Sequence, residues 1–237
     1  MATNPQLTTF SDHESLAAAV VDQVEKTLTI ALEKRERASL AVSGGSSPRL
    51  AHGLLAQRPL AWDRIDVTLV DERWVAPDAN GSNEAFAKET LLTGKAADAR
   101  FIGLWSDAEN LQAGADAAAR ALGTIAMPFD AVLLGLGSDG HTASWFPHAE
   151  GLTEALADDA PTVAAVQAMQ SEVTGTLTER LTLTLPVVAS ARMVGLLMTG
   201  AAKRAVFEKA LQEGDIEDLP VRAILHKRPD IWVGWAP

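Results

Sequence analysis

The stretch AVLLGLGSDGHTASWFP, residues 131–147, decides the fold and holds the strongest functional candidates. Its first four residues are continuously apolar, which is typical of a strand that helices cover on both faces. A glycine-rich turn with Asp139 and His141 follows this strand directly. Ligands of open parallel sheets bind at the carboxyl ends of the strands, so polar residues at that place are candidates for a functional site.

The pattern of a short apolar run followed by a helical stretch recurs along the chain. Eight runs predict strands, at 39–42, 65–70, 101–104, 131–134, 163–166, 180–185, 193–198 and 231–233. Five Ala-rich stretches predict helices, at 14–33, 48–56, 84–92, 108–122 and 203–212. This alternation favours an α/β fold with a parallel or mostly parallel sheet between helices. No repeat or linker divides the chain, so we expect one domain over residues 1–237.

The composition argues against several classes of function. The chain has 31 acidic and 20 basic residues, a net charge of −11, and no basic patch, which disfavours nucleic acid as a partner. It has no apolar window of membrane-spanning length and a polar N-terminus, so we expect no membrane association and a cytoplasmic location. It has no cysteine, which excludes disulfides and thiolate chemistry. No His-x-x-x-His pair or carboxylate cluster predicts a metal site.

The segment SGGSSP, residues 43–48, lies between a predicted strand and a predicted helix. Gly44 and Gly45 allow a close approach of the backbone to a ligand, Ser47 suits the N-cap, and Pro48 suits the first helical position. Free N–H groups at such a helix start can bind phosphate, whereas the alternative is a simple capped turn. The segment also resembles a nucleophile elbow, but Pro48 replaces the final glycine, so Ser46 is a weak candidate nucleophile.

Charged residues follow other predicted strands. Asp71-Glu72-Arg73 comes directly after the apolar run 65–70, where packing does not favour three charges, although a structural ion pair is an alternative. The polar stretch 77–83 predicts a surface loop over the same end of the sheet. Arg180 and Lys203 lie near the ends of two further strands. Lys203 opposes the dipole of its predicted helix, which a bound phosphate would favour, while a solvated cation is the alternative.

The turn GLGSDG, residues 135–140, matches the dinucleotide-binding pattern Gly-x-Gly-x-x-Gly. Its context argues against a dehydrogenase, because the motif lies mid-chain and Pro147 would interrupt the required helix. His141 can accept a proton near neutral pH, and Asp139 can hold its ring. The alternative is that Asp139 caps the turn and His141 is incidental.

Together these motifs resemble the 6-phosphogluconolactonase family, within a wider family that includes glucosamine-6-phosphate deaminases. The resemblance covers nearly the whole chain. Six motifs carry it, in family order: residues 43–48, 71–73, 82–83, 135–147 and 180–184, and Gly200 with Lys203. It implies a three-layer αβα sandwich with a Rossmann-like sheet, and hydrolysis of 6-phospho-D-glucono-1,5-lactone in the oxidative pentose phosphate pathway without an organic cofactor. Deaminases carry a glutamate where this chain has Phe146, which favours hydrolysis over isomerisation.

The resemblance also implies roles for single residues. His141 would be the general base on the attacking water, Asp139 would orient its ring, and Arg73 would bind the carbonyl or anionic end of the substrate. The phosphate would be held by Gly44, Gly45, Ser46, Ser47, Arg180 and Lys203, and Asp71 and Asn83 would also belong to the substrate-binding set. Trp145 replaces the usual leucine, which bears on the shape of the sugar pocket. A non-catalytic phosphosugar sensor is the rival reading, and both a monomer and a homodimer stay open.

Overall fold

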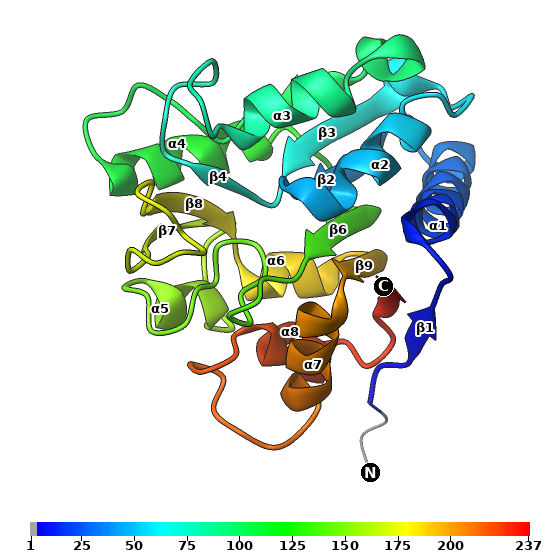
Figure 1. Cartoon of the computed structure of the whole chain (residues 1–237). Coiled ribbons are helices and arrows are strands. Elements are labelled where there is room, and N and C mark those ends of the chain that lie inside the picture. Colours follow the sequence, from blue (N-terminus) through cyan, green and yellow to red (C-terminus); the bar gives the residue numbers. More distant parts are fainter. Residues whose placement is uncertain (1–3) are drawn as a thin grey trace.

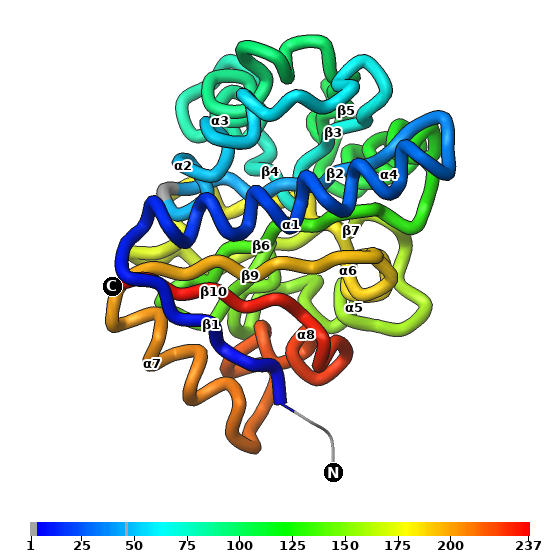
Figure 2. The backbone as a smooth tube through the Cα atoms, turned by 90° about the vertical axis from the view of Figure 1, so that its right-hand side faces the viewer, coloured from blue at the N-terminus to red at the C-terminus, as the bar shows by residue number. Residues whose placement is uncertain are grey.

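The computed structural model describes residues 4–237, with the backbone but not the side chain of Ser46. A parallel sheet lies in the middle of the molecule (Figure 1). Helix α1 (His13–Lys34) covers one side of it, and a smaller sheet with α4 (Leu111–Leu122) and α5 (Leu152–Leu156) covers the other. Figure 2 shows α1 running across the sheet, where it contacts four of its strands. The layered α/β fold predicted from the alternating pattern is confirmed.

The central sheet comprises seven parallel strands within residues 4–237, in the order β1-β10-β9-β6-β2-β3-β5. Their bounds are β1 Leu7–Thr9, β2 Ala38–Val42, β3 Ile65–Leu69, β5 Arg100–Ile102, β6 Ala131–Gly135, β9 Met193–Thr199 and β10 Trp232–Ala236. The chain runs from β2 to β3 on one side and later places β6 on the other side of β2. A topological switch point therefore lies between β2 and β6, where open α/β sheets form their ligand crevice.

The smaller sheet is antiparallel and has the order β4-β8-β7. Its strands are β4 Asp71–Arg73, β7 Val163–Gln167 and β8 Glu179–Leu183. The prediction that residues 163–166 and 180–185 belong to a mainly parallel sheet is therefore wrong for these two strands. Their apolar runs resemble those of the central sheet, and strand pairing over long sequence separations leaves no local signal. Strand β4 was not predicted, because its three charged residues do not form an apolar run. It pairs Arg73 directly with Arg180.

The five predicted helices are all present, with bounds that shift by up to three residues. Besides α1 and α4 they are α2 Ser46–Leu55, α3 Asn83–Thr90 and α7 Ala201–Ala210. The short helices α5, α6 (Leu185–Ser190) and α8 (Val221–Lys227) were not predicted, nor were the 3₁₀ turns Trp62–Arg64 and Gly94–Asp98. No helix in the described part of the chain is both long and apolar enough to cross a membrane.

The start of α2 corrects one local prediction. Its N-cap is Gly45, with a φ of 98°, so Ser47 and Pro48 occupy the second and third helical positions instead of the N-cap and the first. Glycine adopts positive φ at little cost, and the chain therefore turns into the helix earlier than the serine and proline pattern indicated.

His52 is buried between α2 and α3. Its Nδ1 lies 2.9 Å from Thr90 Oγ1, and that hydroxyl donates to the carbonyl of Phe86 at 2.7 Å. The hydroxyl must therefore accept from Nδ1–H, which leaves Nε2 without a hydrogen-bond partner among the described residues. Burial, assisted by the charge of Arg49, lowers the pKa of His52 to about 4. Neutral His52 therefore links α3 to α2, the helix that follows the glycine loop.

This burial predicts an acid-sensitive fold. The pKa of His52 rises from about 4 in the folded protein to about 6.5 when it unfolds, so only the unfolded state binds the proton between these values. The free energy of unfolding should therefore fall by about 3 kcal/mol as the pH decreases from 6.5 to 4. The variant His52→Leu should show a smaller decrease in urea titrations over this range. An unchanged pH dependence would contradict the assignment, and His13→Gln at the exposed start of α1 is the control.

Candidate active site

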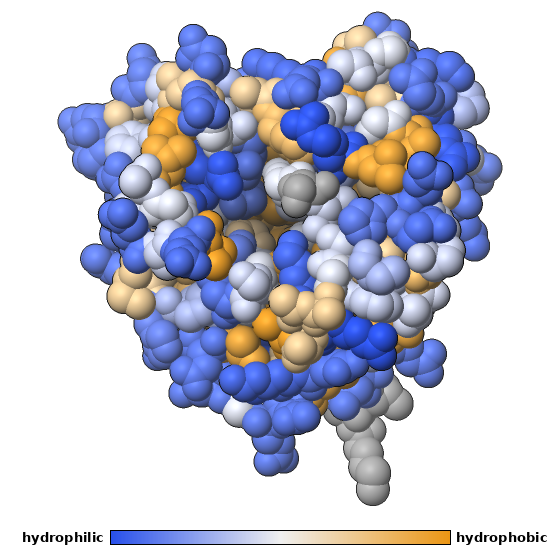
Figure 3. Space-filling view, viewed as in Figure 1, coloured by the Kyte–Doolittle hydropathy of each residue, from blue (hydrophilic) through white to orange (hydrophobic). Residues whose placement is uncertain are grey.

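A cavity of about 370 Å³ opens at the carboxyl ends of β2, β3, β6 and β9. The surface is hollowed at this place (Figure 3). Asp139 lies beside its wall. The predicted site residues that line the cavity are Gly44, Gly45, Ser47, Asp71, Arg73, Asn83, His141, Arg180 and Lys203. The side chain of Ser46 lies outside the described residues, so its predicted contact with phosphate is not placed.

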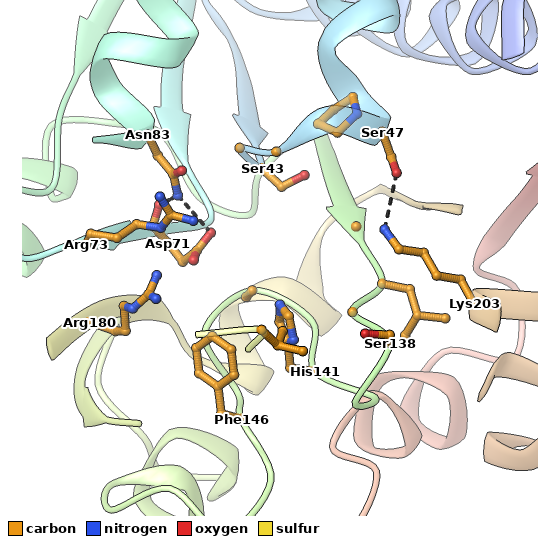
Figure 4. Close-up of a pocket in the computed structure, with 18 of the residues that line it drawn as sticks. Ser43, Ser47, Asp71, Arg73, Asn83, Ser138, His141, Phe146, Arg180 and Lys203 are labelled. Carbon is orange, nitrogen blue, oxygen red and sulfur yellow. Dashed lines mark hydrogen bonds between the residues drawn. The ribbon is translucent and has the colours of Figure 1, made fainter. Parts of the chain in front are cut away.

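His141 and Asp139 form a close pair on the turn after β6. His141 Nδ1 lies 2.6 Å from Asp139 Oδ1, and the backbone N–H of His141 donates to the same oxygen at 3.1 Å. Although burial acts to raise it, the hydrogen bonds and charge of His141 hold the pKa of Asp139 below its usual value. Because the carboxylate engages Nδ1, Nε2 is the ring nitrogen left for the cavity, into which the side chain points (Figure 4).

Gly137 makes room for this pair. A Cβ at this position would lie 2.1 Å from His141 Nδ1 and 2.6 Å from Asp139 Oδ1. The chain after the turn forms no helix before α5, in agreement with the prediction that the glycine pattern is not a dinucleotide loop.

Phe146 lies between His141 and Arg180. Its ring centroid is 4.3 Å from that of His141 and 5.3 Å from the guanidinium carbon of Arg180. The neighbouring Trp145 is fully buried and donates from Nε1 to the carbonyl of Leu183 at 3.0 Å. Trp145 does not line the cavity, so this side chain belongs to the core and not to the pocket wall.

Lys203 and the starts of two helices meet at one end of the cavity. Lys203 Nζ lies 3.4 Å from Ser47 Oγ, which is 3.3 Å from Thr199 Oγ1. The N-caps of α2 and α7 are Gly45 and Gly200, and neither helix has a capping bond from a described side chain. Burial lowers the pKa of Lys203. An anion at this end would accept hydrogen bonds from amides that no side chain satisfies and would offset the buried charge.

Arg73 and Arg180 lie together on the other side of His141 from Lys203 (Figure 4). Like charges directly opposite each other in a sheet are destabilising. Burial lowers the pKa of Arg180 to about 10; Asp71 opposes this shift and Arg73 adds to it. Within residues 4–237 neither guanidinium forms an ion pair. Arg73 donates to the loop carbonyl of Gly81, and Arg180 donates to that of Thr174. The pair is therefore poised to bind an anion.

This arrangement separates two residues that the resemblance placed together. Arg180 and Lys203 were both expected at the phosphate, yet the structure puts Arg180 beside Arg73 and Asp71 and leaves Lys203 with the helix starts. The two cationic groups form opposite ends of one cavity.

Asp71 and Asn83 connect different walls of the cavity. Ser144 Oγ donates to Asp71 Oδ2 at 2.7 Å, and Asn83 Nδ2 donates to the Asp71 carbonyl at 2.9 Å. A Cβ on Gly44 would lie 2.1 Å from Asn83 Oδ1, so Asn83 fills the space between β4 and the glycine loop. The Asp71 carboxylate can accept a ligand hydroxyl, whereas the Asn83 amide already holds β4.

The predicted site residues leave out several cavity residues, among them Ser43, Phe146, Glu172 and Val173. The buried Ser43 Oγ has no hydrogen-bond partner among the described residues, and its place before Gly44 was the available signal. Phe146 lay within the quoted motif, but its contact with Arg180 depends on the second sheet. Glu172 and Val173 come from the loop between β7 and β8, which no local pattern places over the cavity. Ser144, which donates to Asp71 from outside the cavity lining, was missed because the two residues are distant in sequence. Glu72 lies within the quoted motif 71–73 but was not among the predicted site residues.

Known proteins share this chain's sequence and architecture over nearly its full length. The family model described as glucosamine-6-phosphate isomerases/6-phosphogluconolactonase matches residues 11–233. A 6-phosphogluconolactonase of Rhizobium meliloti is 39% identical over 229 residues, covering 96% of this chain and 97% of that protein. Its counterpart in Pseudomonas putida is 40% identical over 227 residues, covering 96% and 91%.

A crystal structure of a 6-phosphogluconolactonase from Shewanella baltica is similar over the whole of both chains, with a TM-score of 0.93 and 34% identity. The six motifs, the layered fold and the cavity at the switch point lead to the same grouping. The chain belongs to the family of glucosamine-6-phosphate isomerases and 6-phosphogluconolactonases.

Proposed function

We propose that this protein hydrolyses 6-phospho-D-glucono-1,5-lactone to 6-phosphogluconate, a reaction of the pentose phosphate pathway. The observation that carries the proposal is the placement of the His141–Asp139 pair between two separate cationic ends of one cavity. The substrate has a phosphate at C6 and an ester carbonyl at C1. It therefore needs an anion site at one end and a base with a second cationic group at the other.

The phosphate belongs with Lys203, Ser47 and the starts of α2 and α7. Backbone amides without a capping side chain and a half-buried ammonium group favour a dianion. At a separation of 4 Å and an effective dielectric constant of 20, one such charge pair is worth about 4 kcal/mol before desolvation. This attraction is local, so the net charge of −11 does not prevent the binding of an anionic sugar.

The hydrolysis needs one base that later acts as an acid. His141 Nε2 accepts a proton from a water molecule, whose oxygen attacks C1 and forms a tetrahedral oxyanion. Asp139 holds Nδ1–H and stabilises the imidazolium that results. When the C1–O5 bond breaks, His141 returns the proton to the departing ring oxygen. The open-chain acid then ionises to a carboxylate, and no covalent bond to the protein forms.

The oxyanion belongs with Arg73 and Arg180. The amides of Gly137 and Gly140 donate to the carbonyls of His141 and Gly137, so these two glycine amides are already engaged. The two guanidiniums instead face the cavity and hold no carboxylate in the described structure. Donors that are fixed before the reaction stabilise developing charge effectively. The same pair would bind the carboxylate of the product.

The Phe146 ring favours this reaction over aldose–ketose chemistry at the same site. It packs on the imidazole of His141, where a second carboxylate would be needed to assist ring opening. With the apolar Phe146 ring at this position, His141 pairs with the carboxylate of Asp139. This pair is sufficient to activate a water molecule.

Replacing His141 tests the base. His141→Ala should lower kcat by about 10²- to 10⁴-fold, because a positioned base contributes that much, and should change KM little. The measurement is lactone hydrolysis at controlled pH, corrected for the spontaneous reaction. Turnover close to the native value would remove His141 from the mechanism. His13→Ala, on the outer surface, is the control.

Gly137→Ala tests the geometry of the pair without removing either member. The added methyl group would overlap His141 Nδ1, so the ring must leave Asp139, and we expect kcat to fall at least about 10²-fold in a folded protein. Gly53→Ala is a matched control, since a Cβ there meets no atom within 4 Å and Gly53 lies inside α2. Equal activity of the two variants would contradict the required close contact.

Product analogues test the two ends separately. 6-Phosphogluconate carries a phosphate and a carboxylate, whereas glucose 6-phosphate carries only the phosphate. Lys203→Ala should weaken inhibition by both compounds about tenfold or more, and Arg180→Ala should weaken mainly inhibition by 6-phosphogluconate. If Arg180→Ala weakened inhibition by both compounds equally, Arg180 would bind the phosphate and not the carboxylate. Arg120→Ala, an exposed residue of α4, is the control.

A further inference from the structure

We propose that Glu72 is a positioning residue for this reaction, whose carboxylate closes the loop 74–82 and thereby holds Arg73 and Asn83 against the cavity. The inference rests on the proposed function, since Arg73 matters there as the residue at the carbonyl end of the substrate.

Glu72 points away from the cavity that its neighbours line. Side chains alternate along a strand, so Asp71 and Arg73 of β4 share one face and Glu72 takes the other. Glu72 has no exposed surface and forms no ion pair within the described chain. A buried carboxylate without a cation is costly, so its hydrogen bonds must account for its place.

Four donors meet the two oxygens of Glu72. Oε1 accepts from the backbone N–H groups of Arg73 and Asn83, each at 2.7 Å. Oε2 accepts from the N–H of Glu84 at 2.7 Å and from Ser82 Oγ at 3.0 Å. Burial raises the pKa of Glu72 to about 7, while these hydrogen bonds act in the opposite direction. Every partner is a donor, so the site is built for the ionised carboxylate.

The donors belong to the two ends of one loop. Arg73 precedes the loop 74–82, and Asn83 and Glu84 follow it as the first residues of α3. The carboxylate therefore bridges the points where the loop leaves the small sheet and where it enters the helix. Inside the loop, the carbonyl of Gly81 accepts from Arg73 Nη1. Glu72 therefore holds the backbone of Arg73 directly. It holds the guanidinium of Arg73 indirectly, through the loop whose Gly81 carbonyl accepts from that group.

Asn83 extends the same connection to the far wall. It donates to the Asp71 carbonyl, and its Oδ1 occupies the space beside Gly44 that a Cβ would need. A shift at the start of α3 would therefore move both the carbonyl end of the cavity and the glycine loop. One buried carboxylate sets the distance between these two walls.

A purely electrostatic role makes the opposite prediction. Burial lowers the pKa of Arg180, and the negative charge of Glu72 is one of the charges that oppose this shift. Removing only this charge would strengthen the binding of an anion at that end. Removing the hydrogen bonds would weaken binding, because Arg73 and Asn83 would no longer be held.

The test compares Glu72→Gln and Glu72→Asp. Gln keeps the length but turns an N–H₂ group toward donors, and Asp keeps the charge but is shorter by one methylene. We expect both variants to raise KM for the lactone and the dissociation constant of 6-phosphogluconate by about tenfold or more, and to lower kcat. Glu84→Gln is the matched control, since its side chain pairs with Lys88 and makes no bond to the loop 74–82.

Three outcomes would overturn the proposal. If Glu72→Asp kept the wild-type kcat, KM and dissociation constant, and Glu72→Gln bound 6-phosphogluconate more tightly, Glu72 would act through its charge alone. A lower kcat with native KM and native affinity would show only a smaller folded fraction. Full activity in both variants would remove Glu72 from the site. If Glu72→Gln does not fold, Ser82→Ala deletes one donor and should raise the same two constants by a smaller factor.

The same experiment keeps this inference apart from the proposed function. A wild-type protein without lactonase activity would contradict the function, and the titration with 6-phosphogluconate would still test whether Glu72 supports the anion site.

Discussion

The parallel pairing of β2 with β6 is the constraint on which the cavity depends. These strands align Leu40 with Ala131 and Val42 with Leu133, and the amide of Ser43 continues the ladder to the Leu133 carbonyl at 3.1 Å. The glycine loop and the His141 turn therefore leave the sheet side by side. Pairing of β6 with β9 adds the start of α7, and pairing of β2 with β3 adds β4. Residues from distant parts of the chain converge because four neighbouring strands end at one edge.

The cavity gathers positive charge in a protein whose total charge is strongly negative. Most of the arginines that form ion pairs bond surface or amino-edge carboxylates, such as Asp66 and Asp130. Arg73, Arg180 and Lys203 lack such partners in the described chain. The antiparallel register sets Arg73 opposite Arg180, which sheet stability alone does not favour. An anionic ligand would make this arrangement favourable, which supports the anion site proposed above.

The sequence predicted features that depend on nearby residues. The apolar runs located six of the seven strands of the central sheet and missed only the short β1 at its edge. The two-residue spacing of Asp139 and His141 on a glycine turn predicted their contact. The predictions failed or were silent where partners are distant. Ser144 meets Asp71 across 73 positions, and β7 and β8 form a second sheet whose apolar pattern looks like that of the first. The grouping of Arg180 with Arg73 follows from that sheet and has no local signal.

The glycine caps of α2 and α7 give the ligand a structural part to play. Helices α1, α3 and α4 begin with Asp12, Ser82 and Asn110, whose side chains accept from the first turn. Helices α2 and α7, which bring Ser47 and Lys203 to the cavity, begin with glycine, and no described side chain accepts from their first turn. A phosphate bound at the proposed position would take the place of the missing capping side chain. Without a ligand the first amides of these two helices would be left to water, so a bound sugar phosphate would also be expected to stabilise the starts of α2 and α7.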